Sequence, residues 1–181
     1  MNIVGLGGPG CRIAEEFENF PQYKVFFVDT NNKKKHKNFF KVKECSSHQE
    51  YEEKYKPLNF KNMKGETTVV LAGTGNISGI ILRLLEQLKE LKLRVLYIKP
   101  DTSSVSKDEN KAERLVFGVL QEYARSNLID RLYVVSNAEM ENVLEQVSIK
   151  NYWQDLNRVL TTTYHMLNVF ENTEPILSTA I

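Results

Sequence analysis

Two glycine-rich segments are the residues of this chain best suited to chemistry, and each stands between a short apolar run and a helical pattern. Glycine lets a backbone come close to a phosphate, and the start of a helix adds unpaired N–H donors and the positive end of its dipole. The pattern is typical of anion sites, although the same turn also occurs without a ligand in α/β folds. The glycines are Gly5, Gly7, Gly8 and Gly10 in the first segment and Gly73, Gly75 and Gly79 in the second.

Apolar runs and helical periodicities predict the elements that hold these segments in place. The runs lack polar alternation, as in strands of a parallel sheet covered on both faces. Strands alternating with crossover helices predict an α/β fold: a doubly wound, mostly parallel sheet with helices on both faces. Strands are expected at residues 2–6, 23–28, 68–71, 94–98 and 132–135, and helices at residues 11–20, 49–55, 81–91, 107–125, 140–147 and 151–170.

The length predicts one hydrophobic core. A chain of 181 residues with 41% hydrophobic side chains is long enough for one core and short for two. We expect residues 1–150 to form the α/β domain and residues 151–181 to add a long helix and a tail packed on it. Ser106 and Glu109 fit a capping box before the helix at 107–125, whose apolar face is expected to hold Ala112, Leu115, Val116, Val119, Leu120 and Tyr123.

Charge is balanced overall and uneven locally. The formal net charge is +1, so no global field recruits nucleic acid or a membrane surface. Residues 31–64 hold ten Lys and four Glu, a local charge of +6. No apolar run is long enough to span a bilayer. Two cysteines and no signal peptide predict a reducing, cytoplasmic setting.

Four predicted strands end in glycine or small polar residues. Besides the glycine segments, Asp101 and Thr102 follow one strand, and Ser136 with Asn137 follow another. Ligands of doubly wound folds lie beyond the carboxyl ends of the strands, so we expect these four loops to converge on one site. There Asp101 and Thr102 would contact a ribose, or they simply terminate the strand.

The two segments resemble the nucleotide-binding domain of the tubulin and bacterial cell-division (FtsZ) superfamily. Residues 8–13, GPGCRI, look like the first loop of that family, and residues 72–79, AGTGNISG, look like a degenerate copy of its glycine-rich signature loop. The resemblance extends over essentially the whole chain. It implies GTP or GDP as ligand, with Mg²⁺ beside a triphosphate, and phosphate contacts from Gly8, Gly10, Cys11, Arg12, Gly73, Thr74, Gly75, Asn76, Ser78 and Gly79.

The carboxyl half resembles tubulin at the residues that read the base. By this resemblance Asn137 and Asn157 read guanine and Trp153 stacks on it. The chemistry fits, because an asparagine amide accepts from guanine N1–H and N2–H and donates to O6, while an indole face supplies stacking. Each residue also has a structural interpretation: a turn at Asn137, a core side chain at Trp153 and a solvated position at Asn157.

The resemblance ends where the family places its activating acids. An ungapped count along the last helix puts Ala180 where an aspartate is expected, and the family's second domain has no counterpart in these residues. The expectation is therefore a guanine-nucleotide-binding protein that acts in assembly, with copies of itself or other protein subunits, or as a structural component. It would have weak or no GTPase activity and no catalytic residues of its own.

Two rival functions stay open. A nucleotide-free scaffold that kept the fold is favoured by the shortened second segment with Ile77 in its middle. An NAD-binding module is favoured by Gly5, Gly7, Gly10 and Asp29, which match the dinucleotide fingerprint of G-x-G-x-x-G followed by an acid about 20 residues on.

Other patterns are weak. Lysines and aromatics interleave in residues 31–64, as in single-strand nucleic-acid sites. A lysine cluster is more often a solvated loop, and the aromatics can equally anchor that loop to the core, so nucleic acid is not expected as a partner. Cys45 and His48 are spaced as half a metal site without a second half, and no metal is expected. The other histidines, His36 and His165, lie near no nucleophile elbow.

Overall fold

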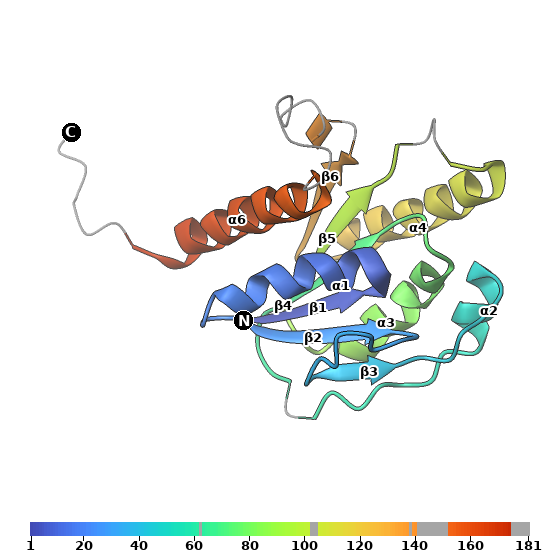
Figure 1. Cartoon of the computed structure of the whole chain (residues 1–181), viewed down its shortest axis with the longest axis horizontal. Helices are drawn as coiled ribbons and strands as arrows, with labels where there is room; N and C mark the ends of the chain where they lie inside the picture. Colours follow the sequence, from blue (N-terminus) through green and yellow to red (C-terminus); the bar gives the residue numbers. More distant parts are fainter. Residues whose placement is uncertain (62, 102–104, 138, 141–151, 175–181) are drawn as a thin grey trace.

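A parallel six-stranded sheet forms the centre of the molecule (Figure 1). The computed structural model describes all residues except 62, 102–104, 138, 141–151 and 175–181. All neighbouring strands pair in parallel, in the order β3-β2-β1-β4-β5-β6. The strands are β1 (Asn2–Leu6), β2 (Lys24–Asp29), β3 (Phe39–Lys41), β4 (Thr67–Ala72), β5 (Leu93–Lys99) and β6 (Arg131–Ser136).

Helices cover both faces of this sheet, so the predicted doubly wound α/β fold is confirmed. Helices α1 and α6 lie side by side over one face, and α3 and α4 cover the other (Figure 1). The helical elements are α1 (Gly7–Glu16), η1 (Phe17–Asn19), α2 (His48–Glu53), η2 (Asn76–Ile80), α3 (Ile81–Leu88), α4 (Lys107–Arg125) and α6 (Tyr152–Asn172). No described helix has the length and apolar character to cross a membrane.

Side chains of the apolar strands contribute to two hydrophobic layers, one on each face of the sheet. On the α1 side, Ile13 and Phe17 pack with Leu160 and Tyr164 of α6. On the other side, α3 contributes a stripe spaced by three and four residues, and its members Ile81, Leu84 and Leu85 are fully buried. The predicted apolar periodicity of these helices therefore corresponds to their contacts with the sheet.

Two local expectations are wrong, and one strand is missed. Helix α1 begins at Gly7 and not at Cys11, because Gly7 has a φ of +69° and turns the chain straight from β1 into the helix. Strand β3 is not expected from the sequence; its three residues are too few to show a pattern. Leu115 is 62% exposed on α4 and does not belong to the apolar face. The helix expected at 140–147 falls largely outside the described residues.

Helix α6 is anchored at the amino ends of the strands by a buried arginine. Arg94 of β5 is 3% exposed, and its guanidinium donates to Asn168 Oδ1 of α6 at 2.9 Å. Carboxylate oxygens of Glu66, Asp130 and Glu171 lie 3.5, 3.5 and 3.1 Å from its nitrogens. Burial of a charge is tolerated only with such partners, so this cluster fixes the carboxyl half of α6 on the sheet.

Candidate functional site

A pocket of about 410 Å³ lies beyond the carboxyl ends of the strands, where doubly wound folds bind their ligands. It is enclosed by α1, the ends of β4, β5 and β6, and the first three turns of α6. Of the described residues that line it, none is acidic. They are Pro9, Arg12, Ile13, Ala72, Thr74, Ile98, Val135, Asn137, Met140, Trp153, Leu156, Asn157 and Leu160.

The three residues predicted to read and stack on a base share this pocket. Asn137 follows β6 directly, while Trp153 and Asn157 lie four residues apart on one face of α6. Trp153 is 60% exposed, so its structural interpretation as a core side chain is wrong. An exposed indole beside two amides is an arrangement that can hold a flat heterocycle.

The start of α1 forms the next part of the wall. Pro9 and Arg12 line the pocket, and the N-cap residue Leu6 supplies no side-chain hydrogen bond to the first turn. Gly10 is buried against β4: a Cβ at this position would lie 2.3 Å from the Val70 carbonyl oxygen. This close approach is possible only for glycine, and it brings the uncapped helix start to the carboxyl ends of the strands.

Cys11 does not line this pocket. Its thiol lies 3.4 Å from the carbonyl oxygen of Gly5 and 3.7 Å from that of Val28. Burial, with a smaller contribution from the charge of Asp29, raises the pKa of Cys11 to about 12, so the thiol stays protonated at neutral pH. Cys11 instead lines a separate cavity of about 340 Å³ with Gly8, Arg12 and Asp29.

That separate cavity bears on the NAD alternative. Asp29 ends β2 and lies near the first glycine segment, as the dinucleotide fingerprint requires. The strand order is also the one common among dinucleotide-binding domains, so topology alone does not separate the two ligand classes. One Asp29 oxygen already accepts from the Thr30 N–H at 2.7 Å.

Gly73, in the second glycine segment, packs against the buried side chains of Tyr97 and Glu113. A Cβ on Gly73 would lie 2.0 Å from the Tyr97 hydroxyl, and the Gly73 N–H donates to the Ile98 carbonyl at 3.3 Å. Tyr97 in turn donates to Glu113, which is 2% exposed, at 3.0 Å. Burial and the neighbouring Glu113 carboxylate raise the pKa of Tyr97. Gly73 therefore makes room for a buried tyrosine–glutamate pair.

Side chains later in this segment bind within the protein. Asn76 donates to the Ser46 carbonyl at 3.1 Å, and the Ser78 hydroxyl donates to the Gly75 carbonyl at 2.7 Å. Gly79 packs on α2, because a Cβ there would lie 2.1 Å from the carbonyl oxygen of His48. Of the phosphate contacts expected in this segment, only Thr74 lines the pocket.

Ile77 occupies the space between the two glycine segments. Its Cγ2 methyl would lie 2.6 Å from a Cβ built on Gly7 and 3.6 Å from one on Gly75. A methyl group offers no hydrogen bond to an anion. This side chain therefore narrows the region in which the backbones of both segments could contact one phosphate.

Of the residues expected to contact a ribose, only Asp101 is described. Asp101 is not among the described residues that line the pocket. Thr102 and Ala180 lie outside the described residues. The apolar lining residues Ile13, Ile98, Leu156 and Leu160 were not predicted as site residues, since in sequence they are indistinguishable from core positions.

Among the described residues no group of three or more His, Cys, Asp or Glu side chains is arranged to hold a metal ion. The Cys45 thiol lies 3.6 Å from the Lys43 carbonyl, and burial lowers the pKa of His48. These two residues therefore have no third ligand in the part of the chain that the structure describes.

Comparisons with known proteins identify the fold. No family model and no curated protein matches the sequence. Solved structures do match, among them "FtsZ dimer, empty" from M. jannaschii, with a TM-score of 0.70 and 13% sequence identity. The match covers 98% of this chain and 56% of the FtsZ chain, so this chain spans little more than half of that protein. At such low identity the likeness shows an FtsZ-like α/β fold and nothing finer.

Proposed function

We propose that this chain is a guanine-nucleotide-binding protein of the tubulin/FtsZ type that acts in assembly or as a structural component. The observation that carries the proposal is the meeting of Asn137, Trp153 and Asn157 in one pocket with Arg12 and Thr74. These residues come from four separate segments of the chain. Their common location matches the set that the resemblance to the tubulin/FtsZ superfamily singles out.

In this proposal the guanine lies against the Trp153 indole, with the amides of Asn137 and Asn157 at its polar edge. The phosphates extend toward Thr74 and the uncapped start of α1, where backbone N–H groups and the Arg12 guanidinium favour negative charge. A triphosphate would bring Mg²⁺ with it. The described lining contains no carboxylate that could activate a water, which favours weak or no hydrolysis.

A second candidate, a nucleotide-free scaffold with the same fold, is favoured by Ile77. Its side chain fills space between the glycine segments, and Asn76 and Ser78 are engaged with other protein groups. In this candidate, assembly with other subunits proceeds without nucleotide.

Trp153 is the only tryptophan of the chain, so intrinsic fluorescence reports directly on the proposed site. Titration with GTP, GDP, ATP and NAD should change this fluorescence most strongly for the guanine nucleotides. Calorimetry should give the same order of affinity. The absence of any guanine-nucleotide binding at millimolar concentration would overturn the proposal, and a preference for NAD would establish the dinucleotide alternative.

Variants test the assigned residues. Asn157→Ala should weaken GTP binding by about tenfold, because it removes the base-reading amide. Asn172→Ala is a matched control at the other end of α6, where it should leave GTP affinity unchanged. Sedimentation with and without GTP separates the two candidates: polymers that form equally well without nucleotide favour the scaffold.

A further inference from the structure

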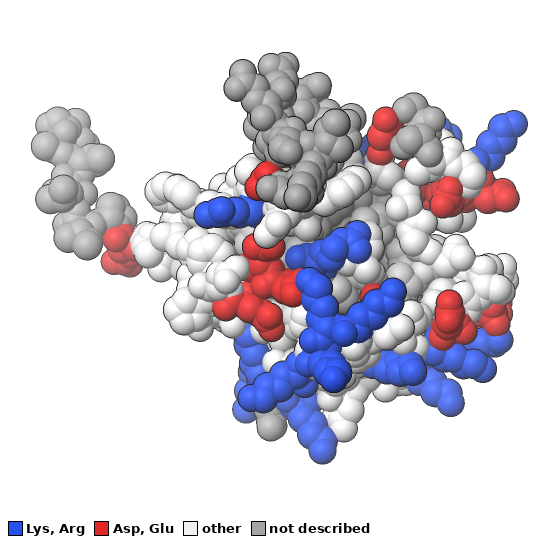
Figure 2. Space-filling model, viewed as in Figure 1, with Lys and Arg blue, Asp and Glu red and all other residues white. Residues whose placement is uncertain are grey.

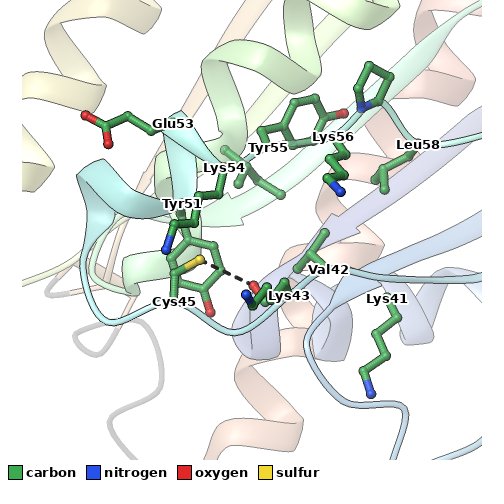
Figure 3. Close-up of a pocket in the computed structure, with 12 residues that line it drawn as sticks. Lys41, Val42, Lys43, Cys45, Tyr51, Glu53, Lys54, Tyr55, Lys56 and Leu58 are labelled. Carbon is green, nitrogen blue, oxygen red and sulfur yellow. Dashed lines mark hydrogen bonds between the residues drawn. The ribbon is translucent and has the colours of Figure 1, made fainter.

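A larger cavity, of about 620 Å³, lies outside the proposed nucleotide pocket (Figure 3). It is formed by the end of β3 and the residues after it, by α2, and by the loop at residues 54–58. Four lysines line it together with one acidic residue, Glu53. The lysines are Lys41, Lys43, Lys54 and Lys56.

The floor of this lysine-lined cavity is apolar and well ordered by packing. Tyr51, Ile80 and Val42 are 5%, 1% and 9% exposed and belong to the hydrophobic core. The wall is held by Gln87 of α3, whose side-chain oxygen accepts from the Leu58 N–H at 3.0 Å and from the Tyr55 hydroxyl. A cavity held in this way needs little reorganisation to bind a ligand.

The cations of the cavity are largely uncompensated. Lys54 pairs with Glu50, whereas Lys41, Lys43 and Lys56 take part in none of the ion pairs found among the described residues. Figure 2 shows Lys and Arg side chains gathered on the β3 side of the molecule. Like charges collected around a concave site raise the local concentration of anions.

We propose that the lysine-lined cavity binds a small organic polyanion, a compound with two or more phosphate or sulfonate groups on an apolar or aromatic body. The lysine ammonium groups would meet the anionic groups, and the partly exposed Tyr55 and Leu58 side chains would contact the body. The volume suits a single small molecule, since ligand sites commonly enclose several hundred cubic ångströms. This site is independent of the proposed guanine pocket, and the two share no described lining residue.

The fluorescent trisulfonate pyranine is a suitable probe, because it combines three anionic groups with an aromatic body. Its anisotropy should rise on titration with the full chain without added nucleotide, and this binding should weaken with added salt. The double variant Lys43→Gln/Lys56→Gln should bind the probe at least about tenfold more weakly.

The matched control is Lys35→Gln/Lys37→Gln, which removes the same charge from exposed lysines of the same region that do not line the cavity. Its affinity should fall less than about twofold. Equal losses in both double variants would show diffuse attraction and overturn the proposal. Inorganic tripolyphosphate has no apolar body, so it should displace pyranine with a lower affinity for the cavity than pyranine has. Equal affinities of the two compounds would overturn the role of the apolar floor.

Discussion

The two ends of the sheet use polar residues in opposite ways. At the amino ends, Arg94 is buried and its guanidinium forms ion pairs with three carboxylates of the same chain. At the carboxyl ends, Asn137 and Asn157 line an open pocket beside a 60% exposed Trp153. Helix α6 thus joins an end where a buried charge is surrounded by carboxylates to an end where amides and an indole line a pocket. Removal of a polar side chain should therefore lower stability at the amino ends and the proposed ligand binding at the carboxyl ends.

The largest effect is expected at the amino ends. Arg94→Met should lower the free energy of unfolding by about 3 kcal/mol, because carboxylates placed around a buried cation lose their partner. Urea denaturation measures this loss. Arg131→Met is the control: Arg131 also pairs with Glu171, but it is 51% exposed, so its loss should cost less than about 1 kcal/mol. Equal costs would contradict the comparison.

Gly10→Ala tests how the carboxyl end is assembled. The new methyl would meet the Val70 carbonyl oxygen at 2.3 Å, so α1 must move away from β4. We expect a loss of about 2 kcal/mol in unfolding free energy, as for overpacked cores. Gly118→Ala in α4 has nothing within 4 Å and should stabilise by about 0.5–1 kcal/mol through helix propensity. Thermal unfolding of both variants would show opposite signs.

Ile77→Ala tests the carboxyl ends of the strands, because it opens the space between the two glycine segments. If phosphates bind there, GTP affinity should rise about fivefold, at a cost of about 1 kcal/mol in stability for a half-buried side chain. Calorimetry with the variant and the parent protein measures the change. Unchanged affinity with intact Trp153 fluorescence response would place the phosphates away from Ile77.

The smallest effect concerns pH at the amino ends. A hydrogen bond from Lys92, assisted by the charge of Arg94, lowers the pKa of Glu66 below its ordinary value of 4.5. The ionised form is therefore stabilised in the folded protein, and this contribution is present above pH 4.5 and is lost as the pH falls through the folded-state pKa.

Glu66→Gln should accordingly lower the unfolding free energy by up to about 1 kcal/mol at pH 7, and the difference from the parent should shrink as the pH drops below 4.5. Urea denaturation at several pH values measures this. A difference that grows on acidification would have the wrong sign for the proposed pairing.

The fold could be predicted from the sequence because its signals are local and repeated. Strands such as β4 and β5 read as uninterrupted apolar runs, and α3 shows helical spacing throughout. Strand β3 could not be predicted, because three residues are too few to show a periodic pattern and the strand forms by pairing with β2. The burial of Leu115 was also predicted wrongly. Apolar residues at helical spacing show which face of α4 is apolar, but not how far the sheet extends beneath that face.

The candidate site was predictable only in part, for a physical reason. Asn137, Trp153 and Asn157 were predicted to act together, and the structure places them in one pocket. A glycine in the sequence, however, indicates that another group packs closely against the backbone there, but it does not identify that group. At Gly73 the space holds a tyrosine hydroxyl, and at Gly79 a neighbouring carbonyl. Such contacts depend on residues distant in sequence.

The anchoring of α6 has a mechanical consequence. The helix is about 30 Å long, and Asn168, which accepts from Arg94, lies fifteen residues from Trp153. Between these two residues Leu156, Leu160 and Tyr164 are buried, so the helix is held along its length and acts as a rigid strut. Contacts as far as fifteen residues away along this strut therefore help to set where the indole stands beside the pocket.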